Sequence, residues 1–459
     1  MFPSTQLLLT TYQASLPTIL CITIQYVLGY VILGFIATFS PATSCLRPTA
    51  VTLLLALAIS IQLAVSHASG LPVPIAQFGA VAISAWTQVF SALDILIHKR
   101  VTYEEHVVWV NRDQDKDEDK ENNSSKEKVI RNGGSKQRIP TTPERSSICQ
   151  AVYFALCLPN NTRLLGTKWQ ISPVYSFYDC SGPIPTPSRA KFLRMRACTL
   201  ISSVLVGAVY LVYNRATCSN SSLSSYCSWV PFPFPSRATL TTVLNQIPSE
   251  LLHPASLALP KSPGVQFYLF TLFLGSIFLL HKIGYTIYSL VAVGCNLCPP
   301  EHWPPFYGAP LEAWTMRRFW GNFWHQSFCS FLHSSTDFVV ATLGLERNSL
   351  ISRYTRYTIC FFISGFLHLT LDHALGIRGS DLLGVMITFL LQPIAFGIED
   401  LVGAILRKYS SSESGEKKDG DPPTRMQRFA GYIWVTAFTF WSWRFWGFAV
   451  LRRVVLLDD

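Results

Sequence analysis

The fold of this chain is constrained most by a series of long apolar runs that contain few or no charged residues. The first run, residues 18–39, contains no Asp, Glu, Lys or Arg. At about 1.5 Å per helical residue, about 22 residues are enough to cross a hydrocarbon core of about 30 Å. A cleaved signal peptide is the alternative, but this run lacks a positively charged segment before it and is longer than the apolar part of a usual signal peptide. We therefore expect a retained transmembrane helix.

Composition and further apolar runs extend this expectation to the whole chain. Hydrophobic residues make up 49% of the chain and charged residues only 14%, whereas a soluble domain carries about 25% charged residues. Further candidate spans lie at residues 52–65, 74–97, 198–213, 267–280, 283–295, 358–371, 382–396 and 432–450, with a weaker candidate at 336–345. The runs on either side of His281 and Lys282 form either one long helix or two. We predict an all-α, polytopic integral membrane protein with about eight to ten transmembrane helices.

Two polar sections separate the apolar runs. Residues 111–145 are rich in Asp, Glu, Lys, Asn and Ser, and such a segment cannot offset the entropy of ordering, so we expect a disordered loop. Residues 163–196 carry six Lys and Arg residues against one acid, Asp179, which places this section in the cytosol by the positive-inside rule. We therefore divide the chain into N-terminal transmembrane helices at 1–97, a polar, partly disordered cytosolic loop at 98–196 and a transmembrane catalytic region at 197–459.

Residues 214–263 follow one span later and are therefore expected on the lumenal side. They contain a glycosylation sequon at Asn220 and two cysteines, Cys218 and Cys227. A lumenal position would suit both a glycan on Asn220 and a disulfide between the cysteines, although free cysteines are the more common outcome at such a spacing.

Several classes of function are disfavoured by the sequence. The net charge of +10 comes from basic residues that flank apolar runs, where they meet anionic headgroups or anionic substrates rather than nucleic acid. Neither a nucleic-acid-binding signature nor a GxSxG, GxxxxGKS/T or HExxH motif is present. Cys295 and Cys298 form a single CxxC pair, which we interpret as packing, and we predict no metal site. The lack of an internal repeat argues against an inverted-repeat transporter.

The most informative motif is Arg-Arg-Phe-Trp-Gly-Asn-Phe-Trp-His-Gln at residues 317–326, followed downstream by His368 inside an apolar run. An ionisable residue in a membrane-embedded helix is costly unless it is used or paired, so His368 is a candidate functional residue. Trp320 and Trp324 are four residues apart and would share one face of a helix. The alternative for this motif is an interfacial aromatic belt with snorkelling arginines, in which His325 only packs.

This motif, together with Ser364-Gly-Phe-Leu-His368, resembles the wax synthase-like branch of the membrane-bound O-acyltransferase superfamily, especially fungal members that acylate small lipophilic metabolites. The resemblance is best over a core of about residues 280–450. It implies that His368 is the catalytic base. In the sterol and diacylglycerol acyltransferases the corresponding motif ends in Asp-aromatic-aromatic-Asn, so Asn322 stands at the position of the Asp and His325 at that of the Asn. Whether His325 binds, orients or packs stays open.

Physical chemistry supports the same roles. A neutral imidazole within hydrogen-bond reach can remove the proton of an alcohol in the transition state, which typically contributes about 10²- to 10⁴-fold. The oxyanion that develops on an attacked thioester could be stabilised by the Asn322 amide, the His325 ring or the Trp324 indole. Two residues one helical turn from His368, Ser364 and Asp372, could orient its ring, although a back-bonded serine and a helix-end aspartate are the more common outcomes.

A coenzyme A donor also needs partners for its phosphates. We assign this role to Arg317 and Arg318, with Trp320 and Trp324 beside them, because guanidinium groups bind phosphate in a bidentate manner. Arg353 and Arg356 are the second choice, and ordinary snorkelling is the alternative for all four arginines, namely Arg317, Arg318, Arg353 and Arg356.

The sequence therefore predicts an acyl-CoA-dependent O-acyltransferase of the endoplasmic reticulum membrane, with no permanently bound cofactor and with acyl-CoA, most specifically acetyl-CoA, as co-substrate. By the resemblance, its acceptor is a lipophilic alcohol such as a terpenoid or meroterpenoid of secondary metabolism. Three alternatives stay open: a long-chain wax ester synthase, an integral-membrane terpene cyclase and a small-molecule transporter that uses His368 in its passage. A cyclase would need acids poised to protonate an alkene or epoxide, and acids are few in the apolar runs.

Overall fold

The computed structural model describes residues 4–68, 75–111, 148–179, 182–218, 263–413 and 423–456. These residues are mostly helical, with one short antiparallel hairpin formed by β1 (Phe177–Asp179) and β2 (Gly182–Ile184). The chain divides into two compact units. The first unit comprises Met1–Ser172 and Ser327–Cys360, and the second comprises Pro173–Gln326 and Phe361–Asp459. The division of the chain at residues 97 and 196 stays a prediction.

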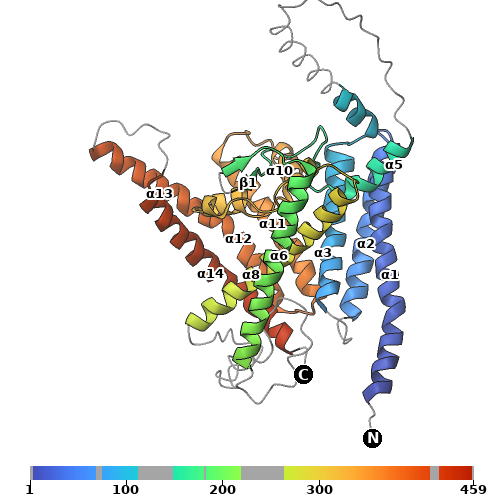
Figure 1. Cartoon of the computed structure of the whole chain (residues 1–459). Coiled ribbons are helices and arrows are strands. Elements are labelled where there is room, and N and C mark those ends of the chain that lie inside the picture. Colours follow the sequence, from blue (N-terminus) through green and yellow to red (C-terminus); the bar gives the residue numbers. More distant parts are fainter. Residues whose placement is uncertain are drawn as a thin grey trace, which may run out of the picture. The chain divides into compact units, whose positions relative to one another are not determined.

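Three long helices form the frame of the first unit. Helices α1 (Ser4–Phe39), α2 (Leu46–Ala68) and α3 (Ile75–Ala92) stand side by side (Figure 1). Helix α3 continues into a π-helical turn, η1 (Leu93–His98), against which α10 (Cys329–Thr342) packs. Helix α5 (Ile148–Cys157) packs on α1 and leads into a 3₁₀ turn, η2 (Leu158–Asn160).

A buried guanidinium joins the ends of these elements. Arg47, near the start of α2, is 1% exposed. Its side chain donates hydrogen bonds of 2.9 Å to each of the carbonyl oxygens of Ser40, Pro41 and Val101. Carbonyl groups at a helix C-terminus lack partners within the helix and carry partial negative charge. Arg47 therefore stabilises the end of α1 and the segment after η1 with a single side chain.

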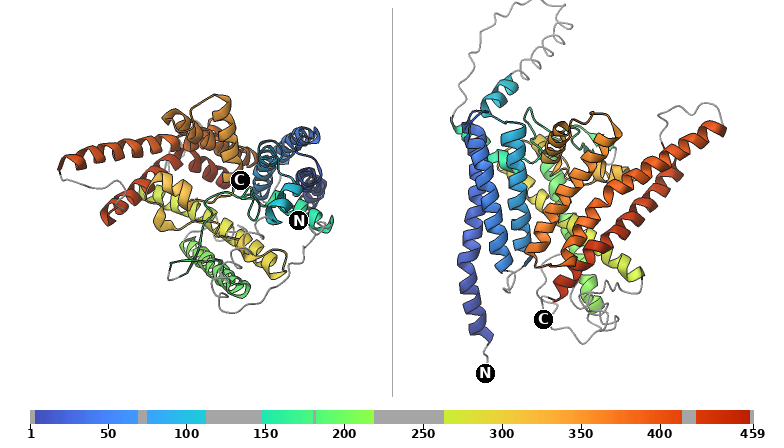
Figure 2. Two further views of the ribbon diagram at one scale, coloured as in Figure 1. Left: turned by 90° about the horizontal axis from the view of Figure 1, so that it is seen from above. Right: turned by 180° about the vertical axis from the view of Figure 1, so that it is seen from behind.

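The second unit contains two pairs of closely packed helices. Helix α6 (Arg189–Cys218) lies beside α8 (Pro263–Gly294), as Figure 2 shows. Helix α12 (Ser380–Leu390) packs on α14 (Arg425–Leu456), and α13 (Gln392–Glu413) follows α12 after a short break. At Gly384 a Cβ atom would lie 1.9 Å from the carbonyl oxygen of Phe445, so only glycine allows this approach of α12 to α14. Helix α11 (Leu350–Ala374) has residues in both units.

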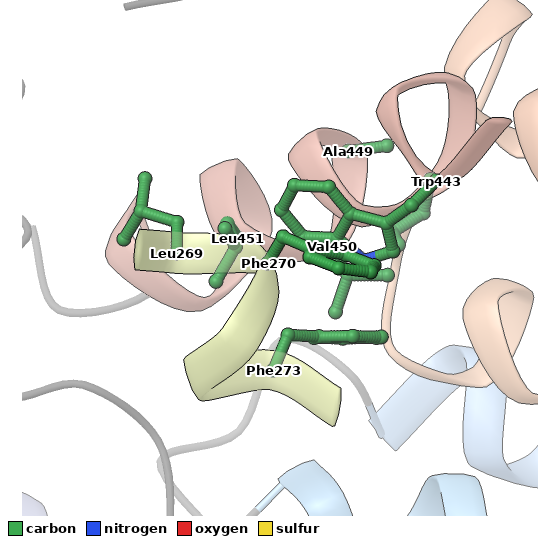
Figure 3. Packing of buried hydrophobic residues seen from close by; sticks show 8 residues of the cluster. Leu269, Phe270, Phe273, Trp443, Ala449, Val450 and Leu451 are labelled. Carbon is green, nitrogen blue, oxygen red and sulfur yellow. The ribbon is translucent and has the colours of Figure 1, made fainter. Parts of the chain in front are cut away.

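An aromatic cluster holds α8 against α14. Phe270 and Phe273 of α8 pack on Trp443 of α14, with ring centroids 5.6 Å apart in each pair. The other buried members are Leu269, Ala449, Val450 and Leu451, which Figure 3 labels, and Ile377. Burial of such side chains stabilises by roughly 1.5–3 kcal/mol each, so this cluster fixes the distance between α8 and α14.

By length and composition, six spans within the described ranges could cross a membrane: Ile22–Phe39, Leu46–Val65, Gly79–His98, Arg189–Val209, Leu269–Gly294 and Ser380–Lys408. The runs at 267–280 and 283–295 are one helix, α8. The runs at 336–345, 358–371 and 432–450 fall largely in α10, α11 and α14, which do not meet the same criteria. Helix α10 has only 14 residues, and the apolar parts of α11 and α14 contain polar and ionisable residues such as His368, Asp372 and Arg444. The expected count of eight to ten thus exceeds the six spans found in the described part.

Three sequence predictions, namely the disordered loop, the glycan on Asn220 and the disulfide to Cys227, concern residues outside the described ranges. Residues 112–147, which make up almost all of the expected disordered loop, are among them, as are Asn220 and Cys227. The membrane orientation, the glycan and the disulfide therefore stay predictions.

Candidate active site

The central motif of the sequence, residues 317–326, folds differently from the regular helix that was predicted. A short helix, α9 (Met316–Arg318), changes into a π-helical turn, η7 (Phe319–Phe323), in which the Trp324 N–H donates to the Phe319 carbonyl oxygen at 2.7 Å. The backbone of Trp324 is extended, so the helix ends there. Trp320 and Trp324 remain together, with ring centroids 5.6 Å apart. Single π-helical turns are frequent at functional sites.

Helix α9 is held at its N-terminus by a carboxylate. Glu399 of α13 accepts hydrogen bonds from the backbone N–H groups of Met316 and Arg317 and from the indole N–H of Trp434. The Thr315 hydroxyl caps the same turn by accepting the Arg318 N–H at 3.1 Å. A carboxylate at a helix N-terminus is favoured by the helix dipole, so these contacts fix where η7 begins.

A loop of the same unit, which contains the 3₁₀ turns η5 (Pro300–His302) and η6 (Pro310–Glu312), packs directly on η7. The Gly308 N–H donates to the Phe323 carbonyl oxygen at 2.9 Å. A Cβ atom at Gly308 would lie 1.8 Å from the Asn322 carbonyl oxygen, so glycine is required for this approach. The Tyr175 hydroxyl donates to the Trp324 carbonyl oxygen at 2.5 Å. The loop residue Tyr307 is thereby placed next to η7.

Trp320 anchors η7 to the helices behind it. Its indole N–H donates to Gln392 Oε1 at 3.0 Å, and Gln392, which is 2% exposed, donates through Nε2 to the Thr388 carbonyl oxygen at 2.9 Å. The Trp320 ring contacts the rings of Phe361 and Phe389 at centroid distances of 5.4 and 6.1 Å. These contacts hold Trp320 in the packed fold. Its role in donor binding stays a prediction.

His368 lies half-buried on α11 with one ring nitrogen already engaged. Its Nδ1 is 2.8 Å from the carbonyl oxygen of Ser364. Because a carbonyl can only accept, Nδ1 carries the proton in this contact and Nε2 keeps its lone pair. The ring packs between Phe389 and Trp446, at centroid distances of 4.7 and 5.3 Å. The geometry thus leaves Nε2 as the basic atom.

The two residues considered as possible orienting groups for His368 behave differently from each other. Ser364 does so through its backbone carbonyl and not through its hydroxyl. Asp372 is 0% exposed, and its carboxyl group lies beside the Trp446 indole without hydrogen-bonding geometry. Since the Trp446 ring also contacts His368, Asp372 is connected to the imidazole through the tryptophan.

His325 follows η7 and belongs to an aromatic cluster. Its ring stacks on Phe306 at a centroid distance of 5.4 Å and contacts the Trp324 ring at the same distance. It also meets the His281 ring edge to face, with centroids 5.5 Å apart and planes at 80°. Burial, together with the smaller effects of the His281 and His368 imidazoles, lowers the pKa of His325 well below its ordinary value. His325 is therefore neutral at physiological pH.

His281 is a site residue that the sequence analysis did not select. It lies on α8, and its Nδ1 is 2.9 Å from the Tyr307 hydroxyl. The sequence signal was present, because His281 is an ionisable residue between two apolar runs, which is the argument that selected His368. Three imidazoles, those of His281, His325 and His368, thus gather in the second unit. Within the described ranges, His, Cys, Asp and Glu side chains do not form a group of three or more that could hold a metal ion.

Asn322, another of the three predicted oxyanion donors, is exposed on η7, whereas the His325 ring is half-buried. An exposed amide is a weaker electrostatic stabiliser than a donor in a water-poor site. The structure thus favours His325 over Asn322 for this role.

The two predicted donor-binding arginines each face a carboxylate. Arg317 Nη2 is 3.0 Å from Asp400 Oδ1, and Arg318 forms an ion pair with Glu312 while its guanidinium lies over the Trp314 ring. Both pairs are partly exposed, so they contribute little to stability and could exchange for phosphate contacts. The second-choice arginines, Arg353 and Arg356, belong to the first unit, where Arg356 pairs with Asp337.

Comparisons with known proteins identify the family of this chain. A model of the "Membrane bound O-acyl transferase family" matches residues 303–391, which include η7, His325 and His368. "Acetyltransferase ataH" of Aspergillus terreus is 32% identical over 308 residues, covering 65% of this chain and 87% of that protein. "Acetyltransferase aurG" of Calcarisporium arbuscula is 25% identical over 302 residues, covering 65% of each chain. "Acetyltransferase pyr8" of Aspergillus fumigatus is 39% identical over 150 residues, covering 32% of this chain and 33% of that protein. The chain thus spans less than two thirds of aurG and pyr8.

Proposed function

Because the chain belongs to the membrane bound O-acyl transferase family, we propose that it transfers an acetyl group from acetyl-CoA to the hydroxyl group of a lipophilic alcohol. The observation that carries this proposal is the His368 imidazole, which is half-buried among aromatic rings with Nδ1 bound to the Ser364 carbonyl and Nε2 available. A fixed neutral imidazole is the group that an alcohol nucleophile needs.

The proposed reaction proceeds by direct attack. Nε2 of His368 accepts the alcohol proton while the alcohol oxygen attacks the thioester carbonyl of acetyl-CoA. The tetrahedral intermediate then collapses, the carbon–sulfur bond breaks, and the departing sulfur takes the proton back from Nε2 to give coenzyme A and the acetate ester. The Ser364 carbonyl, which accepts from Nδ1–H, stabilises the imidazolium that forms between these two proton transfers.

His325 is the proposed oxyanion donor. A neutral imidazole can donate one N–H hydrogen bond to the oxygen that becomes negative in the intermediate. Its low pKa keeps the His325 ring neutral, so that His368 and not His325 takes the proton of the alcohol. The Trp324 indole and the Asn322 amide remain secondary candidates for the same role.

The donor is proposed to lie along η7. Arg317 and Arg318 would bind its phosphates in exchange for their partly exposed partners, Asp400 and Glu312. The paired rings of Trp320 and Trp324 would then flank the rest of the donor. Bidentate contacts from guanidinium groups are well suited to phosphate.

The acceptor is proposed to be an apolar alcohol such as a terpenoid or meroterpenoid of secondary metabolism. Support comes from the aromatic surroundings of His368, formed by Phe389 and Trp446, and from relatives named acetyltransferases. The six candidate spans agree with a membrane enzyme, and we propose the endoplasmic reticulum as its location. A long-chain wax ester synthase, a terpene cyclase and a transporter have less support.

Labelled acyl donors test the proposal. Purified protein in detergent is incubated with a lipophilic extract and either labelled acetyl-CoA or labelled palmitoyl-CoA. We expect label in an organic-soluble ester with acetyl-CoA and little with palmitoyl-CoA. Preference for palmitoyl-CoA would support the wax ester synthase instead. Absence of any labelled ester, with cyclised product or vesicle uptake in its place, would refute acyl transfer.

A further inference from the structure

His281 and Tyr307 make a contact that the proposed mechanism does not use. The His281 Nδ1 atom lies 2.9 Å from the Tyr307 hydroxyl oxygen, and the His281 ring meets the His325 ring edge to face at 5.5 Å. Tyr307 itself is buried and packs against Trp324 and His325, with centroid distances of 5.5 and 6.1 Å. Both members of one hydrogen-bonded pair therefore contact the ring of the proposed oxyanion donor.

The hydrogen bond in this pair holds the His281 ring against a neutral phenol. Burial raises the pKa of Tyr307 above its ordinary value, so its hydroxyl keeps its proton at any physiological pH. The tautomer of His281 sets which partner donates, because both the phenol and a ring nitrogen can donate or accept. In either tautomer the His281 ring cannot rotate without breaking the hydrogen bond.

We propose that the His281–Tyr307 pair is a positioning device for His325, fixing the orientation of the His325 ring so that its N–H points at the reacting carbonyl oxygen. The edge of an aromatic ring carries partial positive charge and its face partial negative charge. The edge-to-face contact between His281 and His325 at 80° therefore favours one mutual arrangement of the two rings. The inference rests on the proposed acyl transfer and assigns the pair a part in it without contact to the reacting atoms.

Removal of one hydroxyl group tests the pair. Tyr307→Phe deletes the hydroxyl group that is hydrogen-bonded to His281 and leaves the aromatic packing in place. We expect kcat to fall by at least roughly tenfold. This loss should be smaller than the loss of about 10²- to 10³-fold in kcat that follows deletion of an oxyanion donor itself. The KM values for acetyl-CoA and for the alcohol should stay unchanged, because the oxyanion contact forms only in the transition state.

Tyr285→Phe is the matched control. Tyr285 lies one turn after His281 on α8, its hydroxyl donates to the Pro304 carbonyl oxygen at 2.5 Å, and its ring packs on Phe306. The control removes a similar half-buried hydroxyl from the same aromatic cluster without touching an imidazole. We expect its kcat to stay within about twofold of the wild type. Equal losses in both variants would overturn the proposal, because a general packing defect would explain them.

Amide replacements of His281 show which ring nitrogen matters. The Gln side chain places its amide nitrogen near the position of Nε2, whereas the shorter Asn side chain reaches only the position of Nδ1. We expect His281→Asn to recover more of the wild-type kcat than His281→Gln does, because the Asn amide can keep the hydrogen bond with Tyr307 at the position of Nδ1. The reverse order would overturn the proposal.

A double-mutant comparison separates positioning from independent effects. If Tyr307 acts through His325, Tyr307→Phe should reduce kcat in the wild type and change it little in the His325→Ala background. Equal factors in both backgrounds would overturn the proposal. Thermal unfolding of each variant in detergent identifies any that fail to fold, and the amide pair at His281 then carries the test.

The activities of His368→Ala and Tyr307→Phe together show whether the proposed acyl transfer fails or only the positioning role of the His281–Tyr307 pair. If His368→Ala keeps wild-type turnover, the proposed acyl-transfer mechanism itself fails. If His368→Ala is inactive while Tyr307→Phe behaves like Tyr285→Phe, only the positioning role of the His281–Tyr307 pair fails.

Discussion

Gly308→Ala is the substitution whose effect the structure defines most closely. The new Cβ would lie 1.8 Å from the Asn322 carbonyl oxygen and 2.9 Å from its carbonyl carbon. Both are backbone atoms, so no side chain can move aside. Ordinary contact begins near 3.4 Å, which means that the loop and η7 must separate by more than 1 Å (3.4 − 1.8 = 1.6 Å along that contact).

This displacement falls on the elements that carry Tyr307 and His325. A misplacement of about 1 Å can cost about 10²-fold in rate, so we expect kcat of Gly308→Ala to fall by about that factor. The strain should also destabilise the fold by about 1–3 kcal/mol. Steady-state kinetics with labelled acetyl-CoA measure the first effect, and thermal unfolding in detergent measures the second.

Gly321→Ala is the matched control for this prediction. Gly321 lies within η7, and a Cβ there would meet nothing within 4 Å. We expect near wild-type kcat for this variant. An unchanged kcat in Gly308→Ala, or an equal loss of activity in both alanine variants, would contradict the prediction.

Three further predictions concern the donor, the fold and the topology. Changing Arg317 and Arg318 together to Gln should raise the KM for acetyl-CoA much more than the KM for the acceptor. Each poorly hydrated phosphate hydrogen bond that is removed costs roughly 1.5–3 kcal/mol, or about 10- to 150-fold in affinity. An unchanged donor KM with poor membrane insertion would instead identify the two arginines as snorkelling anchors. Arg47→Gln should lower the unfolding temperature, because buried carbonyl groups lose their donor at about 1–3 kcal/mol each, and an unchanged melting curve would contradict this. Glycosylation mapping should find sugar on Asn220, and sugar within residues 111–145 would reverse the orientation.

Much of the helical architecture could be predicted from the sequence, because apolar length is a local property. The charge-free run at 18–39 and the run at 52–65 fall in α1 and α2. The family was identified from the motif at 317–326 and from His368, and the comparisons confirm it. The count of spans was harder to predict, since α11 and α14 combine apolar residues with arginines and aromatic residues.

The shape of the site could not be predicted, because contacts between distant segments decide it. The π-helical turn η7 depends on a loop glycine and on hydrogen bonds from other segments, including Tyr175. A sequence window shows the four-residue spacing of Trp320 and Trp324 but not the wider turn. His281 had a sequence signal as an ionisable residue between two apolar runs, but its contact with His325 exists only in the folded chain.

The hydrogen-bond partner of His368 could not be predicted from the sequence either. Spacing suggested that Ser364 and Asp372 share a face with His368, which is correct for a helix. The partner of Nδ1 is nevertheless the Ser364 carbonyl and not its hydroxyl, and the buried Asp372 lies beside Trp446. Side-chain rotamers, which depend on packing against neighbouring helices, decide between such alternatives.

The most direct test of the account is the turnover of His368→Ala with labelled acetyl-CoA and a lipophilic acceptor extract. Membrane insertion and thermal unfolding of the variant are measured in parallel, so that loss of fold is recognised. If Nε2 of His368 is the base, correctly inserted protein should lose at least about 10²-fold in kcat. Near wild-type turnover by correctly inserted His368→Ala protein would contradict the account.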